Sequence, residues 1–417
     1  MQVSFLLLIN GKGYLMRIGL MTDTFLPIVD GVGRVVVAYA NTLPALGHEV
    51  TVSCPLYDTG HRGGYPFELV DYSGFKVPTT PQYRAGAANM DSHYRKRMDM
   101  IELDLVHSHS PFSAGREAQR LAAQRNIPMV STFHSKYYDD FLKATKSETI
   151  AKTMLQGIVS YYNKCDEVWA VSRTSCDVLR EYGYMGPLHV MTNGTEQRFV
   201  TDEDVRDVED RYQLKDFPVF LFVGQINWKK NILRILEAAA LLKDVHPDFR
   251  LVLVGQGPDA VDIMKKAQEL GIGQQTIVPG MVQDMRVLDA FYKRADLFVF
   301  PSLYDTFSLV IREAAAMDTP SVAVTGSCAA ESITHGVNGY LCEDDANSLF
   351  MVMKQAILDP EGNRALGIAA HASIPVSWEE VLKTACERYE NLIATFNKKP
   401  TARSLRFMRK RNQDTWL

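Results

Sequence analysis

The most regular feature of the chain is a succession of short apolar runs, each followed by a polar loop and a longer stretch of helical composition. Residues 17–22, 105–107, 128–133 and 168–171 form one series of candidate buried strands, and residues 218–223, 249–254 and 297–300 form a second. Strands that alternate with helices build parallel sheets, because each helix carries the chain back across the sheet. The pattern predicts an α/β protein with two parallel-sheet domains. Residues 57–100 lack this pattern, and we expect them to be irregular and rich in loops.

The stretch at residues 301–320 combines this pattern with residue types suited to binding. It follows the apolar run 297–300 and leads into an Ala- and Leu-rich helix over residues 309–317. The carboxyl ends of parallel strands face a crevice, where the next helix presents amide groups that lack partners. The amides of Phe307, Ser308 and Leu309 would suit a phosphate. Glu313 lies on the same helix face as Leu309 and would reach a ribose, while Asp305 would accept hydrogen bonds from sugar hydroxyls.

The same residues also have a purely structural interpretation. Asp305 or Thr306 would cap the helix, and Glu313 would lie on its solvated surface. For an isolated pair of acids at this spacing, the structural interpretation is the better one. The longer string around the pair, PSLYDTFSLVIREAAAMDTP, shifts the balance toward binding.

Other predicted strand ends carry glycines or histidines. Gly31 and Gly33 are expected in a turn before a helix that begins near Arg34, where they would permit close approach of a phosphate or sugar. A tight turn without a ligand is the alternative. His109 and His134 end two further strands, and each is either a buried core histidine or a group that faces the crevice.

These features together resemble the retaining GT-B glycosyltransferases of family four. The hallmark of that family is Glu, seven residues and Glu in this strand-loop-helix, matched here by Asp305 and Glu313. Aspartate keeps the charge but shortens the reach, which bears on sugar selectivity more than on fold. The resemblance implies two Rossmann-like domains that face each other across a cleft, with a C-terminal helix that crosses back to the first. It covers the chain apart from the leader and the tail.

The resemblance implies roles for residues of the first and second domains. In the family, Gly, Arg and a Lys five residues after the Arg follow the first strand of the second domain, and both cations hold the leaving diphosphate. This chain has Gly224, Gln225 and Lys230 at these positions. One cation is therefore missing or is supplied by Lys229 or Arg34.

The remaining implied roles concern the sugar, the base and the phosphates. His134 matches the histidine under the transferred sugar, and His109 either supports the residues around the sugar or lies on the acceptor side. The loop at 280–283, with Met281 and Val282, would hold the nucleotide base through its backbone. The donor phosphates would lie at the helix start formed by Thr306, Phe307, Ser308 and Leu309, and the loop with Gly31 and Gly33 would close over the diphosphate or the acceptor.

The resemblance implies transfer of a hexose from a nucleotide sugar, expected to be glucose from UDP-glucose, with retention of configuration. It implies no metal and no cofactor, since the leaving phosphate itself takes the acceptor proton. The strings TDTFLPIVDGV, HSPF, VGQINWKKN and DTFSLVIREAAA resemble most the bacterial branch that glycosylates diacylglycerol, which implies a lipid acceptor. Two alternatives stay open: the same chemistry on a soluble acceptor, and a non-catalytic subunit that binds a nucleotide sugar.

The composition is that of an ordinary globular enzyme, with 46% hydrophobic and 23% charged residues. Six cysteines without CxxC spacing indicate buried thiols in a reducing cytoplasm. No apolar run approaches the ~20 residues of a membrane span. The first residues lack the charged start and cleavage site of a signal peptide, so we expect a cytoplasmic protein.

The expected organisation has five parts. They are a leader at 1–15, an N-terminal acceptor domain at 16–195, a C-terminal nucleotide-sugar domain at 196–375, a crossover helix at 376–395 and a basic tail at 396–417. The acidic run at 201–210 is interpreted as a polar connection between the domains.

The tail carries a charge of its own. Seven Lys and Arg face one Asp after residue 396, a local charge of +6 that leaves −10 for the rest of a chain whose net charge is −4. Such a tail is either solubilising or suited to an anionic membrane surface, which would make the protein peripheral on the inner face of the cell membrane. The acidic remainder argues against a nucleic-acid partner.

Overall fold

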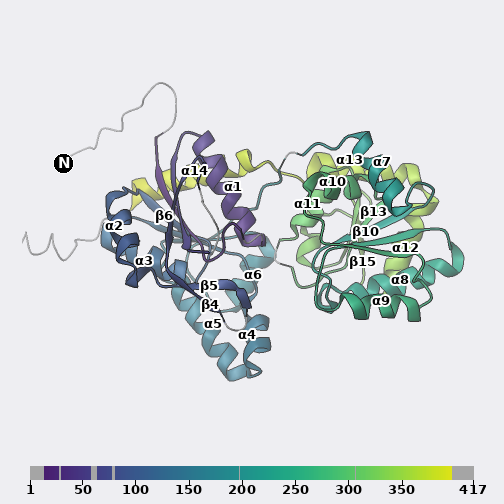
Figure 1. The fold of residues 1–417 in the computed structure, drawn as a ribbon, viewed down its shortest axis with the longest axis horizontal. Helices are drawn as coiled ribbons and strands as arrows, with labels where there is room; N and C mark the ends of the chain where they lie inside the picture. The colour runs from purple at the N-terminus through teal and green to yellow at the C-terminus, as the bar shows by residue number, and fades with distance from the viewer. Residues whose placement is uncertain are drawn as a thin grey trace, which may run out of the picture. The chain divides into compact units, whose positions relative to one another are not determined.

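A computed structural model describes residues 14–27, 30–57, 63–77, 80–196, 198–305 and 307–396, without the side chains of residues 80–82. The chain divides into two compact units, which are described separately (Figure 1). Unit 1 is formed by the chain up to residue 171, by residues 175–191 and by the chain from residue 378 onward. Unit 2 is formed by residues 172–174 and 192–377.

Unit 1 is built on a parallel sheet of seven strands in the order β3-β2-β1-β6-β7-β8-β9. Its central strands are buried along their whole length, as expected for strands covered by helices on both faces. Their bounds are β1 (Arg17–Met21), β2 (Glu49–Pro55), β3 (Glu68–Tyr72), β6 (Leu105–Ser108), β7 (Met129–Phe133), β8 (Glu167–Ala170) and β9 (Leu188–Val190).

The helices of unit 1 connect these strands. Asp30 caps α1 by accepting a hydrogen bond from the amide of Gly33, and Ser147 caps α5 by accepting one from the amide of Ile150. The bounds are α1 (Gly31–Ala45), α2 (Ser92–Met100), α3 (Ser113–Arg125), α4 (Tyr137–Thr145), α5 (Glu148–Tyr162) and α6 (Arg173–Glu181).

The last helix, α14 (Trp378–Thr395), returns to unit 1 and lies beside α1 (Figure 1). Trp378 makes an edge contact with Tyr39 of α1. Tyr389 stacks on Trp169 of β8, with 5.1 Å between the ring centroids. Arg388 Nε lies 2.7 Å from Glu167 Oε1. Unit 1 is therefore completed by a segment remote in sequence.

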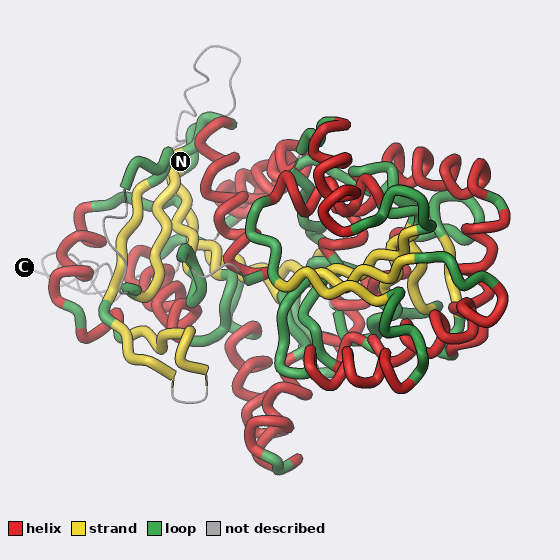
Figure 2. Tube along the Cα trace, turned by 45° about the vertical axis from the view of Figure 1, so that its right-hand side comes forward, coloured by secondary structure: helices red, strands yellow, loops and turns green. Residues whose placement is uncertain are grey.

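Unit 2 is built on a parallel sheet of six strands in the order β12-β11-β10-β13-β14-β15, which Figure 2 shows as a layer between helices. The strands are β10 (Val219–Val223), β11 (Arg250–Val254), β12 (Thr276–Gly280), β13 (Leu297–Phe300), β14 (Ser321–Val324) and β15 (Tyr340–Cys342). The helices are α7 (Asp202–Tyr212), α8 (Ile232–Val245), α9 (Ala260–Glu269), α10 (Met285–Arg294), α11 (Leu309–Ala316), α12 (Ala346–Leu358) and α13 (Pro360–Ser373), with the short 3-10 turns η2 (Trp228–Lys230) and η3 (Cys328–Ser332).

The prediction of two Rossmann-like parallel-sheet domains is confirmed. Two local predictions are wrong. The region at 57–100 contains β3, α2, the short turn η1 (Ala88–Met90) and an antiparallel hairpin of β4 (Gly74–Val77) and β5 (Thr80–Gly86). The acidic run at 201–210 lies in α7, because Thr201 and Asp204 form a capping box and the helix packs on α10.

Six free cysteines are present, five of them buried. In the part of the chain that the structure describes, no helix combines the length and the apolar character needed to cross a membrane.

Candidate active site

The strand order of unit 2 reverses between β10 and β13. From β10 the chain continues to β11 and β12 on one side, whereas β13, β14 and β15 lie on the other. The loops that leave two such strands diverge, and the crevice between them is where open parallel sheets bind ligands. The predicted residues after β10 and after β13 are therefore brought to one place within unit 2.

Lys230 and Asp305 meet at this point. Lys230 ends the turn η2, which Asn227 caps by accepting the Lys230 amide, and Asp305 lies in the loop after β13. The distance from Lys230 Nζ to Asp305 Oδ1 is 2.6 Å, and both side chains are more than four-fifths buried. Asp305 Oδ2 is buried and has no hydrogen-bond partner among the described residues. The pair thus offers a cation and an open carboxylate oxygen side by side.

Helix α11 begins at Leu309, four residues after Asp305. Ser308 precedes the helix with a φ of 50°, a left-handed conformation that side chains other than glycine rarely adopt. Its buried Oγ has no hydrogen-bond partner among the described residues. The first amides of α11 lack carbonyl partners within the helix, as predicted for Phe307, Ser308 and Leu309. Thr306 lies outside the described residues.

Glu313 is buried, with 3% of its surface exposed. The alternative interpretation, in which Glu313 lies on the solvated surface of its helix, is therefore wrong. Tyr292 of α10 donates its hydroxyl to Glu313 Oε2 at 3.0 Å. Arg198 Nη2 lies 3.2 Å from Glu313 Oε1, and Arg198 Nη1 lies 3.0 Å from Asp289 Oδ1. Sequence reasoning missed Arg198, which comes from the segment before α7 and carries no periodic signal.

Arg312 is a second cation that sequence reasoning missed. Its guanidinium lies over the ring of Phe307, 3.9 Å from the centroid, and its Nη1 donates to the Phe307 carbonyl at 3.3 Å. Burial lowers the pKa of Arg312 to about 10. Arg312 therefore fixes the loop that leads into α11, because it contacts both the ring and the backbone carbonyl of Phe307 in that loop.

The other predicted donor residues surround the same edge of the sheet. Gly224 follows β10 and has a φ of 159°, and a Cβ on the neighbouring Gly255 would meet the Gly224 carbonyl at 1.9 Å. Gln225 is exposed and accepts a hydrogen bond from the side-chain amide of Asn227 at 2.7 Å. Met281 and Val282 follow β12, two strands from β10, and Met281 is half exposed.

The strand order of unit 1 reverses between β1 and β6, and the predicted histidines gather near that point. His109 Nδ1 lies 3.1 Å from His134 Nε2, and both side chains are buried. Behind them His107 contacts the Tyr389 hydroxyl and Thr132 Oγ1, at 2.5 and 2.7 Å. Burial lowers the pKa of His134 to about 3 and that of His109 well below its usual value. These imidazoles are therefore neutral at pH 7, and they would act by hydrogen bonding rather than by charge.

Asp23 lies at the end of β1, beside the start of α3. It accepts hydrogen bonds from the hydroxyls of Ser110 and Ser113 and from the amide of Ala114 at 3.0 Å. Burial raises the pKa of Asp23, and these hydrogen bonds oppose the increase. Sequence reasoning used Asp23 only as the end of an apolar run, although a carboxylate directly after a strand is itself a signal.

The position predicted for Gly31 and Gly33 is wrong. Both residues lie inside the first turn of α1, not in a turn before it, because Asp30 caps the helix three residues earlier than expected. A Cβ on Gly31 would meet nothing within 4 Å. The space next to this helix start is therefore open, which still allows a ligand to approach. Among the described residues, no group of His, Cys, Asp or Glu side chains is arranged to hold a metal ion.

Two family descriptions match most of the chain. Residues 29–199 match Glycosyltransferase Family 4, and residues 205–372 match Glycosyl transferases group 1. Alpha-monoglucosyldiacylglycerol synthase of Acholeplasma laidlawii is 26% identical over 92% of this chain and 99% of its own length. The protein of the same name from Streptococcus pneumoniae is 27% identical over 74% of this chain and 71% of its own. A GDP-mannose-dependent alpha-mannosyltransferase of Corynebacterium glutamicum is 26% identical, over 92% and 91% of the two chains.

Solved structures share the fold. Sucrose-phosphate synthase from Thermosynechococcus elongatus superposes with a TM-score of 0.73 at 21% identity, over 91% of this chain and 99% of its own. Anabaena HepE in complex with UDP superposes with a TM-score of 0.71 at 19% identity, over 90% and 100% of the two chains. At these identities the likeness extends to the arrangement of strands and helices.

Proposed function

Because this chain joins a Glycosyltransferase Family 4 domain to a glycosyl transferases group 1 domain, we propose that it transfers glucose from UDP-glucose to a lipid hydroxyl with retention of configuration. The family and the fold show that the chain is a glycosyltransferase. The donor, the stereochemistry and the acceptor are what we propose.

The observation that carries the proposal is the pairing of Lys230 with Asp305 beside the start of α11. Breaking a sugar–phosphate bond leaves positive charge on the sugar and negative charge on the diphosphate. A cation and a helix N-terminus stabilise the anion, and a carboxylate with an open oxygen can accept bonds from sugar hydroxyls. The loops that follow β10 and β13 bring both kinds of group together, which supports this reaction.

Glu313 supports a nucleotide as the leaving group. Tyr292 and Arg198 hold its two oxygens in place at the start of α11, next to the proposed phosphate site. A carboxylate fixed in this way would accept a hydrogen bond from a ribose hydroxyl. Arg198 adds a positive charge beside this buried carboxylate.

In this mechanism the acceptor hydroxyl attacks the sugar while the bond to the phosphate breaks, and the proton passes to the leaving phosphate. No resident metal or cofactor takes part in this scheme. The neutral imidazole of His134 would hold a sugar hydroxyl by hydrogen bonding, while His109 Nδ1 is hydrogen-bonded to its Nε2. Lys230 would replace by itself the two cations of the usual pattern.

The lipid acceptor rests on the names of two relatives, both synthases of alpha-monoglucosyldiacylglycerol. A relative at equal identity is named for GDP-mannose, so the base and the sugar require a direct test.

The test supplies radiolabelled UDP-glucose or GDP-mannose to the full chain with anionic vesicles that contain diacylglycerol, and separately with a mixture of soluble sugars. We expect label from UDP-glucose in the lipid phase, as a product sensitive to an α-glucosidase. Glu313→Gln should abolish transfer, whereas Glu269→Gln on the exposed face of α9 should not. Label only in soluble product refutes the lipid acceptor. Donor binding without transfer or hydrolysis refutes catalysis and favours a binding subunit.

A further inference from the structure

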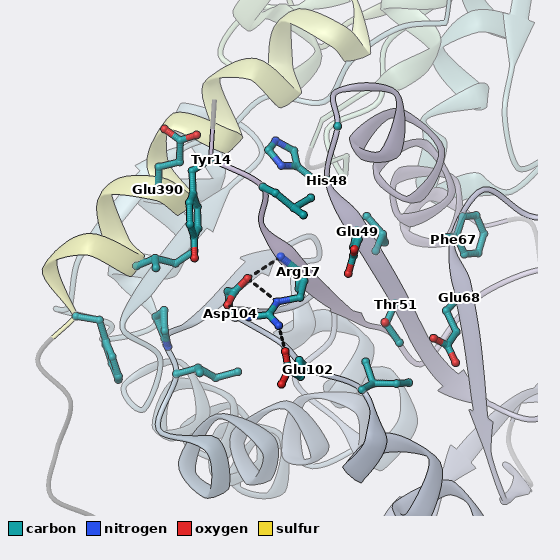
Figure 3. Close-up of a pocket in the computed structure, with 18 of the residues that line it drawn as sticks. Tyr14, Arg17, His48, Glu49, Thr51, Phe67, Glu68, Glu102, Asp104 and Glu390 are labelled. Carbon is teal, nitrogen blue, oxygen red and sulfur yellow. Dashed lines mark hydrogen bonds and ion pairs between the residues drawn. The ribbon is translucent and has the colours of Figure 1, made fainter. Parts of the chain in front are cut away.

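A large hollow of about 2120 Å³ lies within unit 1, at the edge of the sheet opposite to the predicted histidines (Figure 3). It is lined by Arg17, Glu49 and Glu68, which are the first residues of β1, β2 and β3. In parallel strands all amino ends share one edge and all carboxyl ends share the other. His109 and His134 follow carboxyl ends, so the hollow lies at the other edge of the unit 1 sheet from these histidines.

The hollow is strongly acidic. Six carboxylates line it, against the single guanidinium of Arg17, which gives a net charge of −5; the acids are Glu49, Glu68, Glu102, Asp104, Glu387 and Glu390. Arg17 is already engaged, since it binds both Asp104 and Glu102. Glu68 pairs with Arg97 at 3.2 Å.

Three of the acids have no counter-ion among the described residues. Glu49, Glu387 and Glu390 make no ion pair or side-chain hydrogen bond with any described residue, and none of them is buried. Figure 3 shows Glu390 on α14 next to Tyr14, at one side of the hollow. Like charges gathered without partners repel one another, and a cation that enters the hollow relieves this repulsion.

The hollow also offers apolar contacts. Tyr14, Tyr65, Phe67 and Phe396 line it together with Leu15, which is half exposed. A segment with cations at some positions and apolar side chains at others would therefore find both kinds of partner here.

The chain carries one such segment, and it begins at the hollow. Phe396 lines the hollow and is the last described residue. Residues 397–417 have a net charge of +6, with Leu405, Phe407, Met408 and Trp416 among the cations. Attachment at Phe396 gives these residues an effective concentration on the order of millimolar at the hollow, so even weak contacts favour docking.

We propose that the acidic hollow of unit 1 is the docking site for residues 397–417 of the same chain. In the docked state the tail cations pair with Glu49, Glu387 and Glu390, and in the released state they are exposed to solvent. An anionic surface competes for the same cations, so the hollow sets the threshold at which the tail binds such a surface. The inference does not depend on the proposed reaction.

The test is carbodiimide crosslinking of the dilute full chain, which joins lysine amines to carboxylates in direct contact. We expect Lys398, Lys399 or Lys410 to be joined to Glu49, Glu387 or Glu390 within one chain. A mixture of isotopically labelled and unlabelled chains separates these products from crosslinks between chains. Raising the salt to about 0.5 M should reduce the crosslinks severalfold, because the Debye length falls to a few ångströms. Crosslinks spread over unrelated acids, or formed only between chains, would overturn the proposal.

Matched variants separate docking from a general effect of charge. The triple change Glu49→Gln, Glu387→Gln and Glu390→Gln removes three negative charges from the hollow. The control Asp139→Asn, Glu148→Gln and Glu181→Gln removes the same charge from helices α4, α5 and α6. Relative to the control, the triple variant should bind vesicles containing phosphatidylglycerol severalfold more tightly, since its tail is released. Equal affinity of the two variants would refute the competition.

Discussion

Lys230 and Asp305 are 75 positions apart in the sequence, yet Lys230 Nζ and Asp305 Oδ1 are 2.6 Å apart in space. Their loops follow β10 and β13, which are neighbours in the sheet of unit 2. The parallel pairing of β10 and β13 therefore brings two loops that are distant in the sequence to one edge of the sheet. No local sequence motif predicts this contact.

Replacing Lys230 by methionine should lower kcat about 100-fold, because it removes a preorganised cation that would stabilise the negative charge developing on the diphosphate. The Lys230 ammonium also lies 5.9 Å from the centroid of the Phe300 ring, and this contact is lost with the charge. Steady-state transfer assays measure the effect, with Lys265→Met on the exposed face of α9 as the control. An unchanged kcat would remove Lys230 from the mechanism.

Replacing Arg198 by methionine should lower the free energy of unfolding by about 3 kcal/mol, because Glu313 and Asp289 would be left as buried acids without their shared cation. It should also raise the KM for the donor, if Glu313 binds the ribose. Urea unfolding and kinetics measure the two effects. The control is Arg286→Met, whose cation is exposed and pairs with Asp204. A stability loss with an unchanged KM would leave Glu313 with a structural role alone.

Ser308→Gly should raise the free energy of unfolding by about 0.5–1 kcal/mol, since glycine adopts the left-handed conformation without steric cost. The same change removes a buried hydroxyl that has no partner among the described residues, so donor affinity should fall severalfold. Ser308→Ala is the matched control, because it keeps the Cβ and removes only the hydroxyl. An unchanged affinity in both variants would show that Ser308 Oγ does not contact the donor.

Unit 1 should lose stability as the pH falls below about 6.5. The pKa of His134 is lowered to about 3 in the folded state, so between these values the unfolded chain binds a proton that the folded chain does not. Stability therefore decreases by about 1.4 kcal/mol per pH unit for each such histidine. His107 and His109 shift in the same direction. Urea unfolding at several pH values measures this effect. The free energy of unfolding should change less steeply with pH in His134→Gln than in the exposed control His93→Gln.

The elements next to the candidate site were the most predictable from sequence. The strand at 297–300 has the predicted bounds, and the helix after it begins at Leu309 as expected. The reason is that a fully apolar run and an Ala-rich stretch each depend on local chemistry alone. The start of α1 was predicted three residues late, because two glycines outweighed the capping signal of Asp30.

The partners of the site residues could not be predicted in this way. Arg198 reaches Glu313 across 115 positions, and Tyr292 reaches it from another helix. No period or motif in a single sequence records such contacts. The same holds for the hollow of unit 1, whose acids come from β2, β3, the loop before β6 and α14 and are brought together only by the fold.

The return of α14 to unit 1 also imposes an order in time. A ribosome delivers the chain from its first residue to its last, so the strands of unit 1 emerge long before the helix that covers them. Until Tyr389 has emerged, Trp169 lacks its stacking partner and His107 lacks the hydroxyl at its Nδ1. Unit 2, contained in one almost continuous stretch, can complete its core first. The part of the protein that is made first is therefore the part that is finished last.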